Sequence, residues 1–213
     1  MSTCPTIVID IWSDLACPWC YVGKRRLDKA IDQCRGRADF KVNWHPYIID
    51  HGTNRAGEDY LAYNKRRWGS DSWTQSLRRS GLPDGATFKD WKWWPHTLKA
   101  HRLVLLAEKK GRAAEAEELL FQAIYERGQN VSDATTLTAL GQEVGLTGVE
   151  EYLESAEGQE EVLQEDARAK QVLGIQSVPY FLIGCSDSDT RYRLSGAQSG
   201  ATFMEAFRTC IEA

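Results

Sequence analysis

Residues 6–20 of the chain read TIVIDIWSDLACPWC, and this stretch decides the fold. Its first half, Ile7–Ile11, is nearly continuous in β-branched residues, which is typical of an interior strand covered on both faces. Apolar residues at helical spacing follow from Tyr21 to Cys34, so Cys17 and Cys20 stand where a strand passes into a helix. At a helix start the unpaired backbone amides favour a thiolate, and two cysteines at this spacing can close a small disulfide ring. The pattern indicates redox chemistry rather than packing.

Composition limits the kind of protein that can carry this cysteine pair. With 213 residues, of which 42% are hydrophobic, the chain can bury a substantial core as one domain or as a domain with a large insertion. The formal charge of -4 is small and suggests neither a nucleic acid nor a membrane surface as partner. Asp10 and Asp14 interrupt the apolar stretch near the amino terminus, and no other run is long enough to span a bilayer. We therefore expect a cytoplasmic protein that acts on small molecules or other proteins.

The remaining cysteines help to choose between a redox pair, a zinc site and a structural pair. In a reducing compartment structural disulfides are rare, and a close pair is more often catalytic or metal-binding. A structural zinc site would need a second close pair or a cluster of cysteine and histidine. The other cysteines are scattered singly, at Cys4, Cys34, Cys185 and Cys210. We therefore expect no metal and favour a redox dithiol.

The helix after the dithiol makes its two thiols unequal. Cys20 begins an apolar stripe that continues through Leu27 and Ala30 to Cys34, whereas Cys17 lies at the helix tip. We expect Cys17 to be accessible, Cys20 to be buried and Cys34 to be a small core residue.

The rest of the chain reads as an α/β layer structure with a helical insertion. Alternation of Phe40, Val42 and Trp44 with polar residues predicts a second strand, which Pro46 limits. Apolar stripes at helical spacing dominate from about residue 52 to residue 174. They are clearest at Ala100, Leu103, Val104 and Ala107, and at Ala116, Leu119, Leu120, Ala123 and Ile124. We expect residues 1–51 and 175–213 to form one discontinuous domain and residues 52–174 to form an all-helical insertion.

After the insertion the strand pattern returns. Val178–Ile183 and Tyr192–Leu194, separated by a polar turn, predict an antiparallel hairpin. The final segment places Phe203, Phe207 and other apolar residues on one helical face, so a last helix should cover the sheet. Pro179 opens the first strand of the hairpin, which is a plausible place for a cis bond after Val178, although an ordinary strand-opening proline is also possible.

This order of elements, together with the Cys17-Pro18-Trp19-Cys20 turn, resembles a thioredoxin fold with a helical insertion, as in the DsbA-like group. Further motifs resemble the FrnE branch of that group. They are Ser13-Asp14, Tyr21, Gly23, Trp44-His45-Pro46-Tyr47, Thr97-Leu98-Lys99-Ala100-His101-Arg102, Val178-Pro179-Tyr180-Phe181 and Ser195-Gly196-Ala197-Gln198. The resemblance covers almost the whole chain and implies a dithiol oxidoreductase.

The same resemblance implies the roles of the site residues. Cys17 would attack a substrate disulfide, Cys20 would resolve the mixed disulfide, and Pro18 and Trp19 would form the active-site turn. The Val178–Pro179 bond would be cis and would lie against the reactive sulfur, where its backbone could pair with an extended substrate. Separately, Lys24 or Arg25 could favour the thiolate by charge. No bound cofactor is required, and glutathione is a candidate redox partner.

Two other functions fit parts of the sequence. The branch also resembles kappa-class glutathione transferases and 2-hydroxychromene-2-carboxylate isomerases, in which one hydroxyl replaces the dithiol; here both sulfurs are present. A thioredoxin-like chaperone or binding module is the third reading, with Trp91, Trp93 and Trp94 either lining an apolar groove or packing in the core. Core packing is the more ordinary explanation for the tryptophans.

The four histidines are candidate bases, but the sequence shows no carboxylate partner for any of them. His101 belongs to the resembled motif and is the candidate for a supporting role, with a structural role near a helix start as the alternative. The oligomeric state and the direction of disulfide exchange are not determined by these patterns.

Overall fold

The computed structural model describes residues 5–186 and 188–212; Cys4 lies outside them. The helices and strands follow one another in this order: β1 (Thr6–Ser13), α1 (Pro18–Gln33), β2 (Asp39–Pro46), β3 (Glu58–Asp59), α2 (Tyr60–Trp68), α3 (Trp73–Gly81), a 3₁₀ turn η1 (Leu82–Asp84), β4 (Trp93–Trp94), α4 (Leu98–Glu108), α5 (Ala113–Tyr125), α6 (Ala134–Glu143), α7 (Val149–Glu154), α8 (Gln159–Gln171), β5 (Tyr180–Cys185), β6 (Arg191–Ser195) and α9 (Gly200–Glu212).

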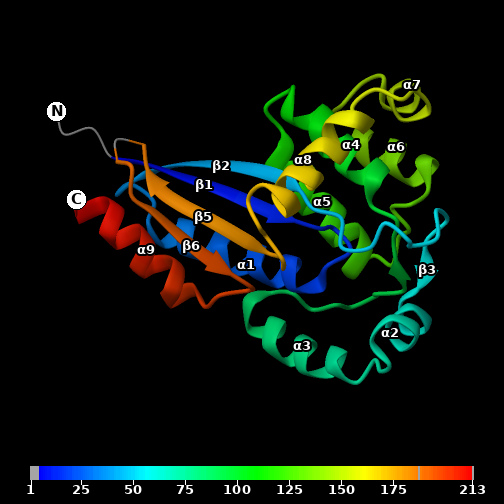
Figure 1. Ribbon diagram of the computed structural model, residues 1–213, viewed down its shortest axis with the longest axis horizontal. Coiled ribbons are helices and arrows are strands. Elements are labelled where there is room, and N and C mark those ends of the chain that lie inside the picture. Colours follow the sequence, from blue (N-terminus) through cyan, green and yellow to red (C-terminus); the bar gives the residue numbers. More distant parts are fainter. Residues whose placement is uncertain (1–4, 187, 213) are drawn as a thin grey trace.

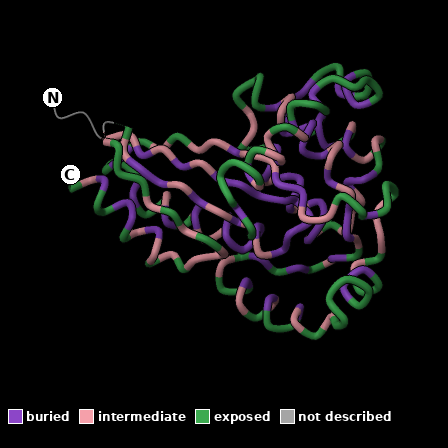
Figure 2. Tube along the Cα trace, viewed as in Figure 1, coloured by how far each residue is buried: buried purple, intermediate pink, exposed green. Residues whose placement is uncertain are grey.

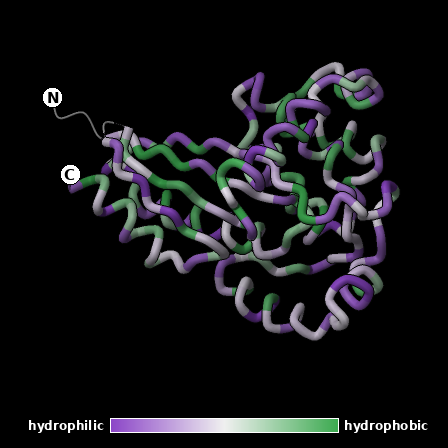
Figure 3. Tube along the Cα trace, viewed as in Figure 1, coloured by the Kyte–Doolittle hydropathy of each residue, from purple (hydrophilic) through white to green (hydrophobic). Residues whose placement is uncertain are grey.

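A four-stranded sheet with the order β2-β1-β5-β6 forms the centre of the cysteine-bearing part (Figure 1). β1 runs parallel to β2 and antiparallel to β5, and β5 and β6 form the antiparallel hairpin expected from the sequence. β1 is therefore an interior strand, as its β-branched residues predict. Its hydrophobic character and that of β5 stand out in Figure 3.

Helices α1 and α9 lie side by side on one face of this sheet (Figure 1). Ile7, Ile9 and Ile11 of β1 are fully buried on that face. Phe203 and Phe207 of α9 are also fully buried, and their rings pack edge-on against Phe181 and Phe40. The final helix therefore covers the sheet as its apolar spacing predicts.

The segment between β2 and β5 contains α2 to α8 and lies beyond one end of the sheet (Figure 1). The predicted stripes on α4 and α5 are buried, and Figure 2 shows how much of this part of the trace is inaccessible. The segment is not all-helical, because β3 and β4 pair as a short antiparallel ribbon. Two residues per strand are too few for a periodic signal, so the sequence pattern could not reveal them.

The tryptophans at β4 support the packing of this ribbon rather than a groove. Trp91 and Trp94 are buried, and their rings stack on Tyr60 and Tyr63 of α2. Trp93 is half-buried. Within the described part of the chain, no helix is both long enough and apolar enough to cross a membrane.

Candidate active site

The dithiol lies at the junction between β1 and α1. Cys17 is the residue that caps the amino end of α1, with an extended backbone, and Pro18 occupies the first helical position. Proline is suited to that position because its missing amide would have no helical partner. A turn holds Cys17 in place, since its amide donates to the carbonyl of Asp14 at 2.9 Å. Cys17 and Cys20 are both free thiols in this structure.

The second half of the site comes from the loop before β5. The Val178–Pro179 peptide bond is cis, and the Cys17 thiol donates to the Val178 carbonyl with a sulfur–oxygen distance of 3.7 Å. The carbonyl of Pro179 accepts the amide of Gly196 at 2.8 Å. The sequence expectation that this turn lies against Cys17 is thus realised across 161 positions of the chain.

Gly23 explains how closely α1 approaches this turn. A Cβ atom at position 23 would lie 2.9 Å from Cγ of Pro179 and 3.3 Å from the Phe181 ring. Contacts that short require the neighbouring atoms to move, and a proline ring at a turn has little freedom to do so. The absence of a side chain at Gly23 lets the helix and the turn touch.

The accessibility expected for Cys17 is wrong. Cys17 is 6% exposed and Cys20 is 2% exposed, so both residues are buried. Cys17 is buried because the Val178 turn covers the helix tip. Local periodicity in the sequence cannot predict this long-range contact. Cys34 is 1% exposed, as expected for a core residue.

The environment of the two thiols still differs chemically. Burial raises the pKa of Cys20 well above its usual value, and the neighbouring Cys17 acts in the same direction. The backbone of Asp14 acts in the opposite direction and lowers the pKa of Cys20. Cys20 therefore remains a thiol at neutral pH, whereas the Cys17 sulfur faces the Val178 carbonyl at the start of the helix.

Tyr125 of α5 is a neighbour of the dithiol that the sequence did not single out. It is fully buried, and its hydroxyl donates to the carbonyl of Leu15 at 3.1 Å. Burial raises the pKa of Tyr125 well above its usual value, and the nearby Cys17 and Cys20 contribute to the rise. The sequence pattern predicts that Tyr125 is a buried helical residue, but it does not indicate that Tyr125 lies beside thiols far away in the chain.

The expectation that Lys24 or Arg25 assists the thiolate is wrong. The Lys24 ammonium is buried and pairs with Asp28 and Glu118, each at 2.6 Å. Arg25 pairs with Glu118 at 2.9 Å and donates to the hydroxyl of Tyr21. Carboxylates of α1 and α5 thus neutralise both charges.

Carboxylate partners exist for three of the four histidines, contrary to the sequence expectation. His45 Nε2 lies 2.9 Å from Asp10 and its Nδ1 lies 3.2 Å from Glu165, while His51 lies 2.9 Å from Asp166. His101 Nε2 lies 3.6 Å from Oδ1 of Asp14, three residues before Cys17. These partners come from other strands and helices, which explains why the chain order hides them.

Glu117 of α5 forms a buried polar cluster together with Asp14 and His101. Asp14, His101 and Glu117 have residue exposures of 1%, 3% and 2%. Burial raises the pKa of Glu117 to about 7, with His101 and Lys24 lowering it and Asp14 raising it. Glu117 shares a helical face with Leu120, Phe121 and Ile124, at i, i+3, i+4 and i+7, and this spacing could have revealed its burial.

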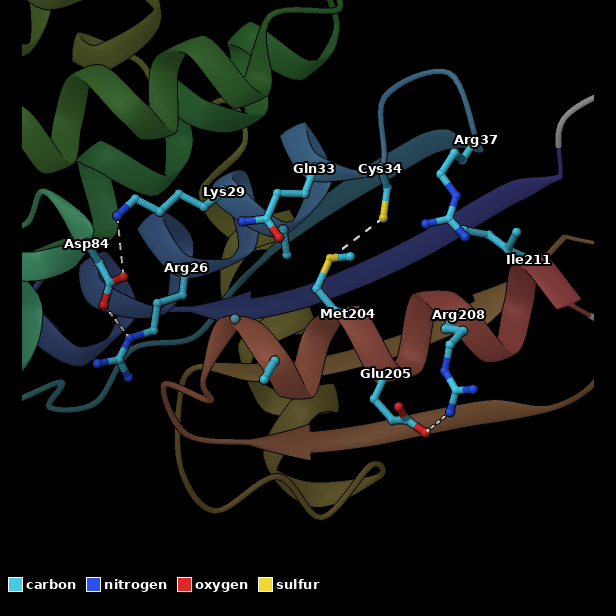
Figure 4. Close-up of a pocket in the computed structure, with 13 residues that line it drawn as sticks. Arg26, Lys29, Gln33, Cys34, Arg37, Asp84, Met204, Glu205, Arg208 and Ile211 are labelled. Atoms are coloured by element: carbon cyan, nitrogen blue, oxygen red, sulfur yellow. Dashed lines mark hydrogen bonds and ion pairs between the residues drawn. The ribbon is translucent and has the colours of Figure 1, made fainter.

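The described part of the chain shows no metal centre beside the dithiol. Across residues 5–186 and 188–212, no group of three or more histidine, cysteine, aspartate or glutamate side chains is placed to hold a metal ion. A cavity of about 550 Å³ between α1 and α9 reaches Cys34, but that thiol contacts Met204, and Arg26 and Arg208 at the rim are paired with Asp84 and Glu205 (Figure 4). Cys185 is half-buried at the far end of β5.

The fold and the site together define a thioredoxin-fold protein with a helical insertion. The defining features are a four-stranded sheet, a dithiol at the start of the first helix and a cis-proline turn against the Cys17 sulfur. Comparison with family models narrows this class. Residues 8–208 match the DsbA-like thioredoxin domain, so the chain belongs to that family.

Individual relatives agree with this assignment. The chain is 28% identical over 181 residues to the uncharacterised protein YwbO of Bacillus subtilis, covering 84% of this chain and 88% of that protein. It is similar to the crystal structure of a probable DsbA oxidoreductase from Streptomyces coelicolor, with a TM-score of 0.82, 27% identity and coverage of 96% and 89%. A 2-hydroxychromene-2-carboxylate isomerase shares the fold, with a TM-score of 0.73, 15% identity and coverage of 96% and 97%. A cytosolic disulfide reductase, DsbM of Pseudomonas aeruginosa, also shares it, with a TM-score of 0.66, 18% identity and coverage of 96% and 98%.

Proposed function

We propose that the protein is a FrnE-type thiol-disulfide oxidoreductase that exchanges disulfides with protein or small-molecule thiols through Cys17 and Cys20. The observation that carries this proposal is the position of Cys17. Its sulfur lies at a helix start and 3.7 Å from the Val178 carbonyl, beside the cis-proline turn, with a second thiol one helical turn away. Helix starts favour negative charge on sulfur, and an adjacent thiol allows the mixed disulfide to be resolved.

The reaction has two exchange steps. The Cys17 thiolate attacks one sulfur of a substrate disulfide, so the S–S bond of the substrate breaks and its other sulfur leaves as a thiolate. Cys20 then loses its proton and attacks Cys17, which releases the second substrate sulfur and leaves a Cys17–Cys20 disulfide. The substrate gains two electrons and the protein loses two. In the opposite direction the same steps oxidise a substrate dithiol.

The raised pKa of Cys20 supports this division of roles. A buried thiol that keeps its proton does not compete with Cys17 for the substrate. It becomes a nucleophile only after a base removes that proton. The contact between Cys17 and Val178 also supports Val178 and Pro179 as the substrate-facing turn, and Pro18 and Trp19 as the turn that separates the thiols.

We place the reaction in the cytoplasm with glutathione as a candidate redox partner and without a bound cofactor. Free thiols at all described cysteines fit a reducing compartment. The disulfide reductase DsbM, which shares this fold, is described as cytosolic and has been crystallised with glutathione.

Turnover of insulin disulfides or glutathione disulfide by purified variants tests the proposal. Cys17→Ser should abolish turnover, and Cys20→Ser should trap a covalent adduct on Cys17 that mass spectrometry detects. Cys185→Ser is the matched control, because this half-buried thiol lies at the opposite end of the sheet and should leave turnover unchanged. Full activity of the Cys17→Ser variant would refute the proposal.

One alternative has a specific observation in its favour, namely the fold shared with a 2-hydroxychromene-2-carboxylate isomerase. A glutathione-dependent transferase or isomerase needs no resolving thiol. Glutathione conjugation of a model electrophile, or isomerisation, that survives in Cys20→Ser would favour this alternative. A chaperone or binding module would instead suppress aggregation without either thiol. Of the three tryptophans that could line its groove, Trp91 and Trp94 are buried and Trp93 is half-buried.

A further inference from the structure

A second pair of cysteines lies at the end of the main sheet that is remote from the dithiol. Cys185 is the last residue of β5, and Cys210 lies near the carboxyl end of α9. β5 begins at Tyr180, next to the cis-proline turn that faces Cys17. Because a strand advances about 3.3 Å per residue, Cys185 lies roughly 16 Å from Tyr180. The exchange at Cys17 and Cys20 uses neither of these two thiols.

The alternation of side chains along β5 directs Cys185 toward α9. Phe181 and Ile183 are buried, and the ring of Phe181 packs edge-on against Phe203 of α9 with centroids 4.9 Å apart. Residues two positions apart share one face of a strand, so Cys185 lies on the same face as Phe181 and Ile183. Cys185 also packs against the core cluster that contains Cys210. Its side chain therefore belongs to the layer between the sheet and the last helix.

The spacing of buried residues along α9 directs Cys210 toward the sheet. These residues recur at i, i+3, i+4 and i+7 and so form one stripe: Phe203, Ala206, Phe207 and Cys210. Phe207 packs against Phe40 of β2, with ring centroids 5.0 Å apart. Phe40 pairs in register with Ile7 of β1, and Ile7 pairs with Cys185. The stripe that ends in Cys210 therefore reaches the row of the sheet that holds Cys185.

The two cysteines lie at nearly the same level along the sheet. β5 and α9 run side by side in the same direction, and both end at the side of the sheet where β1 begins (Figure 1). From the contact between Phe181 and Phe203, the strand advances about 13 Å to Cys185 and the helix about 10 Å to Cys210. The offset of about 3 Å is within the separation of about 4.4–6.8 Å that a disulfide spans between Cα atoms.

The two thiols interact electrostatically and differ in accessibility. Burial raises the pKa of Cys210, and the neighbouring Cys185 raises it further, whereas Arg191 lowers it. The effect of Cys185 requires the two sulfurs to be near each other, because charges more than about 10 Å apart are largely screened. Cys210 is 6% exposed, whereas Cys185 is half-buried. A disulfide in solution therefore reaches Cys185 more readily than Cys210.

Cys34, on the neighbouring helix α1, provides an internal comparison. It is 1% exposed, and its sulfur lies 3.7 Å from the sulfur of Met204 on α9. A thioether cannot close a disulfide, and the burial of Cys34 keeps reagents from its thiol. Cys34 should therefore stay reduced under conditions that oxidise Cys185 and Cys210.

We propose that Cys185 and Cys210 form a second, reversible disulfide that fastens α9 to β5 when a low-molecular-weight disulfide, such as oxidised glutathione, reaches Cys185. The Cys185 thiolate attacks one sulfur of oxidised glutathione, its S–S bond breaks, and one glutathione leaves as a thiolate that takes a proton from solvent. The Cys210 thiol then loses its proton to solvent, and its sulfur attacks Cys185 and releases the second glutathione. The protein loses two electrons, and one molecule of oxidised glutathione becomes two of reduced glutathione.

Peptide mapping of a Cys17→Ser/Cys20→Ser variant tests the inference without interference from the dithiol. After incubation with oxidised glutathione, the protein is denatured, its free thiols are alkylated, and it is digested without reduction. Mass spectrometry should find the Cys185 peptide joined to the Cys210 peptide, with Cys34 alkylated, and dithiothreitol should reverse the link. Cys210→Ser in the same background should instead accumulate a glutathione adduct on Cys185. The unmodified protein, treated in the same way, should carry the same link.

Thermal unfolding measures the fastening of α9 independently of the mapping. Cys185 and Cys210 are 25 positions apart, so a bond between them restricts the unfolded chain. The melting temperature of the oxidised variant should exceed that of the reduced variant by roughly 7–14 °C, and Cys210→Ser should show no such rise.

Several outcomes would overturn the inference. They are a glutathione adduct that persists on Cys185 while Cys210 is free, a link from Cys185 to another cysteine, an unmodified Cys185, and an oxidised form that melts no higher than the reduced one. Because Cys17 and Cys20 are absent from the tested variant, each of these outcomes leaves the proposed function standing.

Discussion

Two buried acids of the helical part make opposite use of their carboxylates. Asp166 of α8 accepts the amide of Ile48 at 2.7 Å, and its oxygens lie 2.9 Å from His51 and 2.8 Å from Lys170. Glu117 of α5 is equally inaccessible but leaves Oε2 without a partner beside a cavity. A buried carboxylate whose oxygens both have hydrogen-bond partners stabilises the fold. A buried carboxylate with an unpaired oxygen can instead take up or release a proton.

The buried charge of Arg102 is fully hydrogen-bonded. Its guanidinium donates to the carbonyls of Tyr152, Leu153, Ser155 and Glu157 between 2.5 and 3.2 Å. His101, the preceding residue of α4, lies 3.6 Å from Asp14 and lines a cavity instead. A fully hydrogen-bonded side chain and one with an unpaired ring nitrogen thus occupy adjacent positions of one helix.

The largest effect on stability should come from removing the charge of Asp166. Asp166→Asn removes the charge that holds His51, Lys170 and the Ile48 amide, and it should destabilise the fold by roughly 3–4 kcal/mol at pH 7, near the lower end for broken buried ion pairs. Urea denaturation measures this free energy. Asp32→Asn, which removes an exposed partner of Arg35, is the control and should change the stability by less than about 1 kcal/mol. An Asp166→Asn variant as stable as the unmodified protein would contradict the stabilising role of Asp166.

Glu117→Gln should have the opposite sign and should depend on pH. Because burial raises the pKa of Glu117 from 4.5 to about 7, the folded state keeps a proton that the unfolded state releases between these values. The unmodified protein therefore loses stability as pH rises from 4.5 to 7. Glu117→Gln should be the more stable form at pH 8, by on the order of 2–3 kcal/mol, with little difference below pH 4.5.

The comparison of unfolding curves at pH 4.5 and pH 8 checks this prediction, with both proteins measured in the same buffer series. A Glu117→Gln variant that is less stable than the unmodified protein at pH 8 would mean that the Glu117 carboxylate has a partner in the folded state.

The smallest effect should come from Glu118, the next residue along α5, and it should reverse the sign again. Lys24 and Arg25 lower the pKa of Glu118 against the opposing effect of its burial. The folded state therefore releases a proton that the unfolded state still holds, and stability is gained above pH 4.5 and lost as pH falls. Glu118→Gln should cost about 1 kcal/mol at pH 7 and almost nothing at the lowest pH at which the protein stays folded. Equal pH responses of the two neighbouring variants would contradict the opposite pKa shifts of Glu117 and Glu118.

The sequence predicts the fold more completely than it predicts the site. The strands of the main sheet, helices α1, α4, α5 and α9 and the turn at Pro179 follow from periodicity and turn chemistry, because each signal is local. Lys24 and Arg25 illustrate what local signals miss. Their proximity to Cys17 along the chain suggested a role at the thiol, but the folded chain offers them closer carboxylates on α1 and α5.

The polar cluster could be predicted only in fragments. His101 is a candidate through its motif, whereas Asp14 appears in the sequence only as part of the resembled Ser13-Asp14 motif and carries no predicted role. Glu117 stands in a run of acids, Glu115, Glu117 and Glu118, where charge alone predicts a solvated face. Asp14 lies beside His101, and His101 and Glu117 line one cavity. This arrangement depends on how α4 and α5 pack beside β2, which no local pattern encodes.

The contact between Cys17 and Val178 has a consequence for the newly made chain. A ribosome adds about 5–20 residues per second, so the 161 positions between them take roughly 8–32 seconds to synthesise. During that interval the dithiol exists without the turn that covers it. Cys17, which is 6% exposed in the finished protein, is then open to any disulfide or oxidant in its surroundings. The emerging chain therefore depends on its compartment, rather than on its own fold, to keep the reactive sulfur intact.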